Sequence, residues 1–319
     1  MTDTRHAATS KAVRLTRFGD PDVLEVGPVP IPQPVDDEVL VRVRAASVNP
    51  VDGKTRSGEF PPVGEGDLPI VLGRDLAGTI EAVGTRAHNM LSHGDRVFAH
   101  IGFDRGAQSE FVVVRAVELV AMPAELDFVT AAAVPLAAMT AWQGLFDHGE
   151  LRAGQTVLIH GGAGGVGHLA VQLAKAKGAT VIATCSGRDR DFVRDLGADR
   201  VIDYKAQRFE DEVSDIDVVL DLVGGETQAR SLDVLRPGGI LVSTLQPPSE
   251  EDVRAKGVRA APRFLAEPNA AQLGEVAALI ASGQVRITVA ETFAMADVAA
   301  AQRRLDKGGV RGKIVLTLD

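Results

Sequence analysis

The stretch of sequence that decides the fold is Gly162-Ala163-Gly164-Gly165-Val166-Gly167, a G-x-G-x-x-G pattern. It follows a short apolar run, Thr156–His160, that predicts a buried strand, and it opens a helical pattern over Gly165–Lys177. In such a setting the first glycine allows a tight turn, the second lets the backbone approach a pyrophosphate, and the third lets the helix pack closely on the strand. A purely structural turn is the alternative, but the strand and helix on either side favour a dinucleotide-binding turn.

The residues after this turn alternate between predicted strands and predicted helices. The expected strands are Thr180–Ser186, Arg200–Tyr204, Asp217–Val223 and Gly239–Thr244, and the expected helices are Asp189–Leu196 and Thr227–Leu235. Strands that alternate with helices imply a parallel, doubly wound sheet, which is an α/β fold class. Residues 246–269 contain proline and charge with little periodicity, so we expect a loop or a loosely held helix there.

The first part of the chain has the pattern of β structure. Short apolar runs, separated by Gly, Pro or Asp, predict strands at Lys11–Phe18, Glu38–Val48, Leu76–Val83, Asp95–Ala99 and Glu110–Val114. The prolines between the first two runs exclude a central strand there, and the whole region predicts a small, partly open β-barrel. The chain then ends in a predicted series of helix Ala270–Ala281, strand Arg286–Phe293, helix Asp297–Leu305 and strand Lys313–Leu318.

Charge and cysteine content narrow the functional class. The chain carries 34 basic and 43 acidic residues, a net charge of −9. Proteins that bind the phosphate backbone of nucleic acids have the opposite charge, so nucleic acid is not expected as a partner. The one cysteine, Cys185, excludes an intrachain disulfide and a cysteine-based zinc cluster. Residues 1–10 lack the apolar segment of a signal peptide, and these features together favour the cytoplasm.

One uncharged stretch, Phe128–Phe146, is long enough to span a bilayer. It is rich in alanine, however, and contains Thr130, Pro135 and Gln143. Aspartate lies at both ends, without the lysine and arginine cluster that orients a membrane helix. We therefore expect a buried helical pair at a domain junction and no membrane span.

The end of the strand that follows the glycine turn indicates which dinucleotide is bound. A site for NAD places Asp or Glu there to bind the ribose 2′-hydroxyl, whereas residues 185–188 read Cys-Ser-Gly-Arg. The Ser186 hydroxyl and the Arg188 guanidinium suit a 2′-phosphate, because arginine meets phosphate with a fixed fork of donors. Asp189 is expected to be solvated, and Tyr204, which ends the next strand, is placed in the same pocket. An exposed surface arginine is the alternative for Arg188, but the missing acid favours NADPH.

Several stretches also resemble the medium-chain dehydrogenase/reductase family, in the same order along the chain. They are Val48-Asn49-Pro50-Val51-Asp52-Gly53-Lys54, Leu72-Gly73-Arg74-Asp75-Leu76-Ala77-Gly78, Gly94-Asp95-Arg96-Val97-Phe98, the Gly162–Gly167 turn, Asp221-Leu222-Val223-Gly224-Gly225 and Arg311-Gly312-Lys313-Ile314-Val315-Leu316. The resemblance implies a GroES-like catalytic domain over residues 1–130 and a Rossmann NADPH-binding domain over residues 131–265. It also implies that the C-terminal segment, residues 266–319, returns to the catalytic domain.

The departures from the zinc-dependent members of that family are informative. Those members carry a cysteine where this chain has Asn49, a His-Glu pair where it has Arg74-Asp75, and a third ligand near Leu136. One cysteine and seven scattered histidines offer no zinc spacing, so no metal site is expected. The chain therefore resembles the zinc-free branch, which includes the quinone oxidoreductases, zeta-crystallin and the alkenal or enone reductases.

The resemblance also implies roles for single residues. In that branch an asparagine at the position of Asn49 lies near nicotinamide and substrate, and a threonine at the position of Thr140 contacts the cofactor. Val223 and Lys313, in two of the shared motifs, are likewise assigned to cofactor binding. Many quinone reductases carry tyrosine where this chain has Lys54, while enone-reducing relatives often have lysine. An exposed lysine after a turn is the alternative for Lys54.

The expected reaction is hydride transfer from NADPH to a quinone or to the β-carbon of an α,β-unsaturated carbonyl compound. Negative charge develops on the carbonyl oxygen, and Asn49, Lys54 and a cofactor hydroxyl are candidate donors to it. No general acid stands out, so we expect water to supply the proton. Phe60, Phe98, Phe103 and Phe264 are candidates to line the pocket, with core packing as the alternative.

Two other functions remain open at this point. A zinc-free NADP-dependent carbonyl or alcohol dehydrogenase would oxidise alcohols. An NADPH-binding protein with a structural or regulatory role would bind the cofactor without turnover. The family resemblance also implies a homodimer formed through the edge of the Rossmann sheet.

Overall fold

The computed structural model describes residues 8–87 and 91–318. The chain divides into two compact units. The first comprises Met1–Leu136, Pro268–Gly274 and Val289–Asp319, and the second comprises Ala137–Glu267 and Glu275–Thr288. The domain boundaries expected after residues 130 and 265 stay a prediction.

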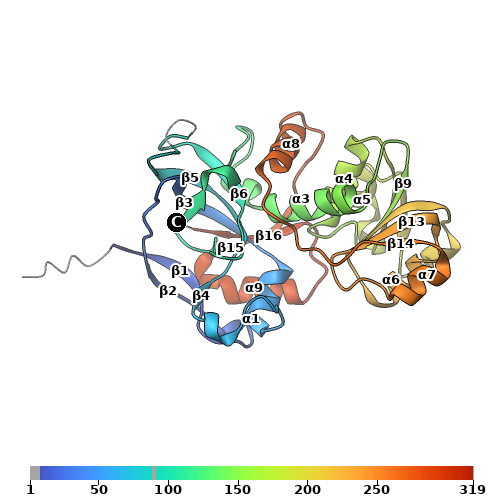
Figure 1. The fold of residues 1–319 in the computed structure, drawn as a ribbon, viewed down its shortest axis with the longest axis horizontal. Helices are drawn as coiled ribbons and strands as arrows, with labels where there is room; N and C mark the ends of the chain where they lie inside the picture. The colour runs from blue at the N-terminus through green and yellow to red at the C-terminus, as the bar shows by residue number, and fades with distance from the viewer. Residues whose placement is uncertain (1–7, 88–90, 319) are drawn as a thin grey trace, which may run out of the picture. The chain divides into compact units, whose positions relative to one another are not determined.

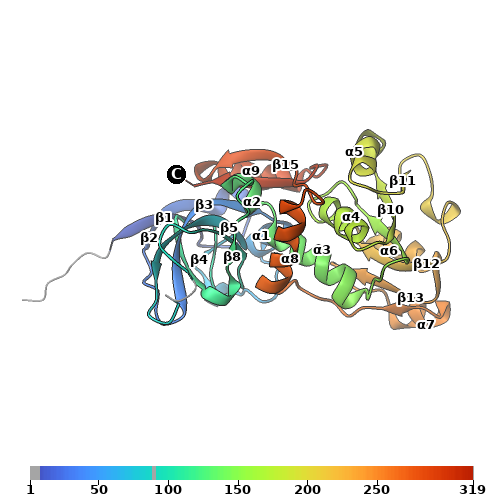
Figure 2. The ribbon, with the colours of Figure 1, turned by 90° about the horizontal axis from the view of Figure 1, so that it is seen from above.

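Two sheets build the first unit (Figures 1 and 2). The smaller sheet has the order β2-β1-β4, with β1 at Thr9–Leu15, β2 at Leu24–Pro30 and β4 at Ile70–Val71. The larger sheet has the order β15-β16-β3-β5-β6-β8, and β7 also pairs with β3. Its strands are β3 (Glu38–Val48), β5 (Asp75–Val83), β6 (Arg96–His100), β7 (Phe111–Arg115), β8 (Val120–Ala121), β15 (Val289–Ala294) and β16 (Lys313–Thr317).

The apolar pattern of β3 explains its central place. Val39, Val41 and Val43 are buried, while Arg42 and Arg44 are exposed, because successive side chains of a strand point to opposite faces. The buried face belongs to one core that side chains of both sheets share. Three helices complete this unit, α1 (Pro50–Ser57), α2 (Phe128–Ala132) and α9 (Val298–Asp306).

The second unit is a six-stranded parallel sheet with the order β11-β10-β9-β12-β13-β14. The strands are β9 (Thr156–His160), β10 (Thr180–Cys185), β11 (Arg200–Asp203), β12 (Ile216–Asp221), β13 (Leu235–Ser243) and β14 (Arg259–Ala260). The order reverses direction between β9 and β12, as in the doubly wound sheet that the strand–helix alternation predicts. The helices α4 (Gly167–Ala176), α5 (Arg190–Asp195), α6 (Gly225–Ser231) and α7 (Glu250–Lys256) connect these strands.

The remaining elements are short or belong to both units. The uncharged stretch 128–146 forms α2, α3 (Pro135–Trp142) and a π-helix over Gln143–His148, and α8 spans Ala270–Ala281. Single 3-10 turns occur at Pro21–Val23, Glu65–Asp67, Ala116–Glu118, Gly187–Asp189, Phe209–Asp211 and Met295–Asp297. None of the helices in the described part of the chain has the length and apolar character to cross a membrane.

Four strands of the described chain were not predicted from the sequence: β2, β4, β8 and β14. β2 contains Pro28 and Pro30 and was expected to be a connection, but it pairs with β1 at the edge of the small sheet, where a missing N–H is tolerated. The span 246–269, expected as a loop or loose helix, contains α7 and the edge strand β14. All four strands lie at sheet edges.

Candidate functional site

Three strand ends meet at one place in the first unit. β3 ends at Val48, and its antiparallel neighbours β5 and β16 both begin beside that end. β5 begins with Asp75 and β16 begins with Lys313. The register therefore places Asp75 and Lys313, which are far apart in sequence, next to Ser47 and Asn49.

The carboxamide of Asn49 is held at both ends by these neighbours. Its Nδ2 donates to Asp75 Oδ2 at 2.9 Å and to Ser47 Oγ at 3.1 Å, and its Oδ1 accepts from Lys313 Nζ. Asn49 is only 3% exposed. Ser47 Oγ also donates to Asp75 Oδ2, so the two acceptors of Nδ2 lie on the same side of it and share one amide proton.

Asp75 and Lys313 form a buried pair of opposite charge. Asp75 is 0% exposed and Lys313 is 4% exposed, and Lys313 Nζ lies 4.0 Å from Asp75 Oδ2. Asp75 also accepts hydrogen bonds from Ser47 Oγ and from the backbone amide of Leu136. Burial lowers the pKa of Lys313, and the charges of Asp75 and Asp52 oppose that shift. Since an unpaired buried charge is costly, we expect neither charge to be tolerated without the other.

Asp52 is a second buried carboxyl group beside Asn49. Its Oδ2 accepts from the backbone N of Asn49 at 2.8 Å, in the first turn of α1. Its Oδ1 is buried without a hydrogen-bond partner among the described residues. Burial raises the pKa of Asp52 from 3.8 to about 6, and the charge of Arg74 is the largest opposing effect.

We expect Asp52→Asn to remove a pH-dependent loss of stability. Between pH 3.8 and about 6 the folded protein holds a proton on Asp52 that the unfolded chain has released, so the free energy of unfolding falls as pH rises through this range. The shift corresponds to about 3 kcal/mol. Relative to the parent, Asp52→Asn should therefore gain about 2 kcal/mol between pH 4.5 and pH 8. Urea unfolding at both pH values measures this gain, and a difference that does not change with pH would contradict it.

Arg74 holds a loop of its own chain. Its Nη1 donates to the carbonyl oxygens of Gly102 at 3.2 Å and Arg105 at 2.8 Å, and its guanidinium carbon lies 4.4 Å from the centroid of the Phe103 ring. The Phe103 ring packs on Phe60, with ring centroids 5.0 Å apart. Arg74 is thus engaged where zinc-dependent relatives have a ligand, and the role of the two rings in a substrate pocket stays a prediction.

Lys54 lies on α1, the helix that Asn49 precedes. Its side chain is exposed, and within the described residues no hydrogen bond or ion pair of its ammonium is present. The structure therefore does not bring Lys54 into the Asn49 network, and its catalytic role stays a prediction.

The glycine turn of the second unit connects β9 to α4. Gly161 has a φ of 75°, a conformation that favours glycine. A Cβ at Gly162 would lie 3.0 Å from the Cβ of Ala183, and a Cβ at Gly167 would collide with the carbonyl oxygen of Gly161. At Gly164 such a Cβ would make an ordinary contact with Gly161 O at 3.4 Å, so packing within the protein does not require glycine at this position. The turn thus fits the phosphates of a dinucleotide at the N-terminus of a helix.

The residues expected to select the dinucleotide follow the ends of two neighbouring strands, Ser186 and Arg188 after β10 and Tyr204 after β11. Ser186 Oγ donates to Asp189 Oδ2 at 2.6 Å, and Arg188 Nε lies 3.4 Å from the same oxygen. Asp189 is 7% exposed, so the expectation that it is solvated was wrong. Its short side chain accepts the hydrogen bond from Ser186 within the loop that follows β10. The Arg188 side chain is 65% exposed, and Tyr204 is 57% exposed beside it, with its backbone N donating to Cys185 O.

The other predicted cofactor residues fall in different places. Val223 follows β12, is 52% exposed, and its N donates to Asp221 Oδ1 at 3.0 Å. Thr140 is half-buried on α3 in the second unit. Lys313, expected with them, belongs to the first unit and to the Asn49 network. The cofactor roles of these three residues stay predictions.

Ser47, Asp75 and His160 were not predicted as site residues. His160 ends β9 directly before the glycine turn, with Nδ1 at 3.0 Å from Thr184 Oγ1 and Nε2 at 2.9 Å from Ser231 Oγ. Burial lowers the pKa of His160 to about 4, so the ring is neutral at pH 7 and links two strands to α6. The available signal was a polar residue directly at a predicted strand end, which Asp75 and His160 share.

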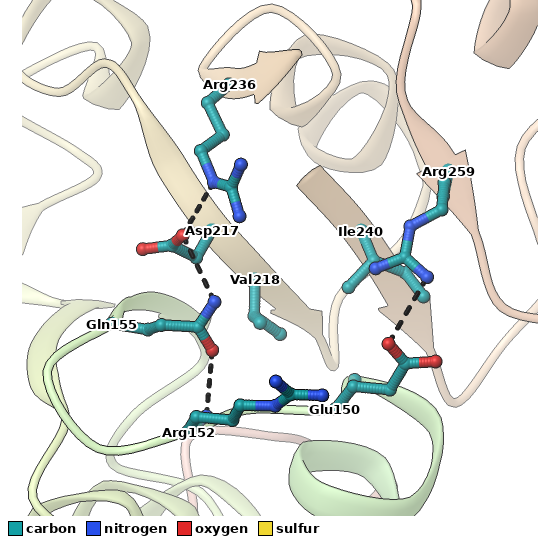
Figure 3. A pocket seen from close by; sticks show the side chains of 9 residues that line it. Glu150, Arg152, Gln155, Asp217, Val218, Arg236, Ile240 and Arg259 are labelled. Atoms are coloured by element: carbon teal, nitrogen blue, oxygen red, sulfur yellow. Dashed lines mark hydrogen bonds and ion pairs between the residues drawn. The ribbon is translucent and has the colours of Figure 1, made fainter. Parts of the chain in front are cut away.

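A separate pocket of the second unit lies beside the first residues of β9 and β12 (Figure 3). It encloses about 190 Å³. Arg236 Nε lies 2.6 Å from Asp217 Oδ1, and Arg259 Nη1 lies 3.4 Å from Glu150 Oε2. Arg152 lines the same pocket, as Figure 3 shows. No residue predicted for the active site lines this pocket.

Residues 8–87 and 91–318, which the structure describes, contain no group of three or more His, Cys, Asp and Glu side chains that could hold a metal ion. Asp75 and Asp52, the two buried acids near Asn49, are surrounded by Lys313 and Arg74, which are cations of the protein itself.

Comparison with known proteins identifies the family. Residues 35–124 match the model of the alcohol dehydrogenase GroES-like domain, and residues 196–316 match that of a zinc-binding dehydrogenase. A quinone oxidoreductase of Pseudomonas aeruginosa is 34% identical over 96% of this chain and 99% of its own. The chain belongs to the medium-chain dehydrogenase/reductase family.

Other members of the family support the same assignment. The NADPH-dependent alkenal/one oxidoreductase of Arabidopsis thaliana is 35% identical, over 96% of this chain and 79% of its own. The quinone oxidoreductase structure from Coxiella burnetii has a TM-score of 0.88 at 35% identity and covers 98% of this chain and 100% of its own. The predicted fold class, a Rossmann doubly wound sheet plus a GroES-like β-barrel, is confirmed.

Proposed function

We propose that this protein is an NADPH-dependent, zinc-independent reductase that transfers hydride to a quinone or an α,β-unsaturated carbonyl compound. The names of the two relatives above, a quinone oxidoreductase and an NADPH-dependent alkenal/one oxidoreductase, support this substrate class. The observation that carries the proposal is the engagement of Asn49, Arg74 and Asp75 in contacts within the protein. Zinc-dependent relatives use these positions for the metal, so alcohol activation by zinc is not the chemistry we propose here.

The cofactor would lie on the second unit's glycine turn. Bound NADPH supplies a hydride for an electrophilic carbon. We propose that the turn at residues 162–167 holds the pyrophosphate, because α4 begins there. The N–H groups of Gly162 and Gly164 already donate to Thr184 O and Gly161 O, so other backbone N–H groups of the turn would bind the phosphates. Ser186, Arg188 and Tyr204 would hold the 2′-phosphate, with Thr140 and Val223 as further proposed contacts. Lys313, first expected with them, contacts Asn49 and Asp75 in the first unit.

Asn49 and Lys54 are the proposed catalytic residues of the first unit. Asp75 and Ser47 lie on one side of Asn49 Nδ2, so we propose that a substrate oxygen accepts the amide proton on the other side. The exposed ammonium of Lys54 would donate to the same developing negative charge. Water would then supply the proton to the α-carbon.

A panel of acceptors tests the reaction. NADPH oxidation, followed by absorbance, should occur with quinones, enones or enals, and oxidation of simple alcohols with NADP⁺ should be negligible, because no side-chain base stands ready to remove the alcohol proton. In heavy water with unlabelled NADPH, deuterium should appear at the α-carbon of the product. Deuterium at the β-carbon would contradict hydride transfer from NADPH to that carbon, and alcohol oxidation as the main activity would indicate a dehydrogenase instead.

The purified protein should contain no stoichiometric zinc. Zinc in proteins is bound by cysteine, histidine and carboxylate side chains. The amide of Asn49 and the guanidinium of Arg74 are not such ligands. Elemental analysis should therefore find well under one zinc per chain, and chelators should leave NADPH oxidation unchanged. If chelation removed both bound zinc and activity, the proposal of a zinc-independent reaction would be wrong.

We further propose a homodimer in the cytoplasm, with a catalytic domain at residues 1–130, an NADPH-binding domain at 131–265 and a returning segment at 266–319. The edge position of β14 in the six-stranded sheet supports a dimer through that edge. Light scattering coupled to gel filtration should give twice the mass of one chain. A monomeric mass at assay concentrations would contradict the dimer.

A further inference from the structure

We infer that Lys313 is a positioning residue: its ammonium, paired with Asp75, holds the carboxamide of Asn49 in the one orientation that the reaction uses. The inference rests on the proposed function for its catalytic consequence. It differs from the cofactor role first assigned to Lys313, because the contacts of Lys313 lie in the first unit.

The orientation argument starts from the two ends of a carboxamide. The oxygen and the NH₂ group are nearly equal in size, so only their partners decide which way the group points. Here the oxygen of Asn49 accepts from the Lys313 ammonium, and the NH₂ group donates to the Asp75 carboxylate at 2.9 Å. The reversed orientation would place NH₂ against an ammonium and oxygen against a carboxylate, which is unfavourable at both ends.

The hydrogen bonds that Lys313 and Asp75 form with the Asn49 amide are strong because all three residues are buried from water and held by the sheet. Asn49, Asp75 and Lys313 are 3%, 0% and 4% exposed, so water does not compete for these bonds. Hydrogen bonds to charged groups are roughly twice as strong as neutral ones. Backbone pairing also fixes the cation, because Ile314, next to Lys313, pairs with Val48, next to Asn49.

A stabilising role alone does not account for this arrangement. A buried charge pair is often no more stabilising than apolar side chains of the same size. The pair here has an amide between its two charges, with one charge at each end of that amide. That geometry serves to orient the amide.

Asparagine labelling gives a direct test that needs no activity. The chain has asparagine only at positions 49, 89 and 269, so a [15N]asparagine sample has few side-chain NH₂ signals, and Asn49→Ala identifies the one of interest. In the parent, the Asn49 NH₂ protons should exchange slowly with solvent. In Lys313→Met they should exchange at least about tenfold faster, because the amide then loses its preferred orientation. Lys307→Met, which changes an exposed lysine, is the matched control and should leave the signal unchanged.

Kinetics supply the second readout. Lys313→Met should lower kcat about tenfold or more with little change in KM, and it should cause no further loss in an Asn49→Ala background, since Lys313 acts through Asn49. If Lys313→Met does not fold, Asp75→Asn/Lys313→Met removes both charges together and serves in its place. Asn49 signals like those of the parent, or independent additive losses of kcat, would overturn the inference. Absence of NADPH oxidation in the parent would instead contradict the proposed function. The solvent exchange of the Asn49 NH₂ protons in Lys313→Met would then still test whether Lys313 orients the Asn49 amide.

Discussion

Replacing Asn49 by alanine should lower kcat about tenfold to a hundredfold while leaving NADPH affinity nearly unchanged. Removal of one oxyanion donor from an enzyme typically costs about a hundred- to a thousandfold in kcat. We expect a smaller loss because Lys54, a cofactor hydroxyl and water remain as donors. The dinucleotide turn lies in the second unit and Asn49 in the first, so we expect cofactor affinity to serve as an internal reference.

The same substitution also removes a partner from two buried charges. Asp75 and Lys313 each lose a hydrogen bond, which should cost about 1–3 kcal/mol of stability. Urea unfolding and circular dichroism therefore need to show that the assayed variant is folded. Asn269→Ala is the matched control: its side chain accepts only from Gln272 N at 3.1 Å at the start of α8 and is exposed. A folded Asn49→Ala variant with the kcat of the parent would remove Asn49 from the proposed mechanism.

Elements with a strong local pattern were predicted well. The strands Glu38–Val48 and Thr156–His160 and the helix Ala270–Ala281 have the predicted bounds. Each combines a clear apolar pattern with residues that end it, such as Asn49-Pro50 after the first strand. Such signals are local, so one sequence suffices to read them.

The features that sequence reasoning missed depend on distant residues. β2 and β14 exist because a neighbouring strand offers them an edge to pair with. The network around Asn49 joins residues that are 264 positions apart, since Lys313 binds Asn49 through the register of β16 on β3. No periodicity predicts such a contact, although the motifs containing both residues were recognised.

Asp189 shows a different limit. An acid three residues after the predicted strand end was expected to face solvent, whereas it accepts from Ser186 and is buried. Short polar side chains in a tight loop often bond to near neighbours. The local loop geometry, which residue types alone do not determine, decided where this side chain points.

Arg188→Ala should weaken NADPH binding about tenfold to a hundredfold and leave NADH binding unchanged. The Arg188 side chain is 65% exposed at the end of β10, beside the glycine turn, and the two cofactors differ only in the 2′-phosphate. A hydrogen bond to a charged group contributes about 1.5–3 kcal/mol, which corresponds to that loss of affinity. The contact with Asp189 at 3.4 Å does not prevent this role, because an exposed ion pair is weak.

Arg190→Ala is the matched control, since it removes the same charge from an exposed position two residues away. If general electrostatic attraction alone drew NADPH to this part of the protein, both variants would lose affinity equally. If Arg188 binds the phosphate with its fork of donors, only Arg188→Ala should show the large loss, and high salt should reduce the effect of Arg190→Ala. Titration of each variant with NADPH and NADH, followed by cofactor fluorescence, separates these cases. An equal loss for both cofactors in Arg188→Ala would mean that Arg188 supports the loop through Asp189 and does not select the phosphate.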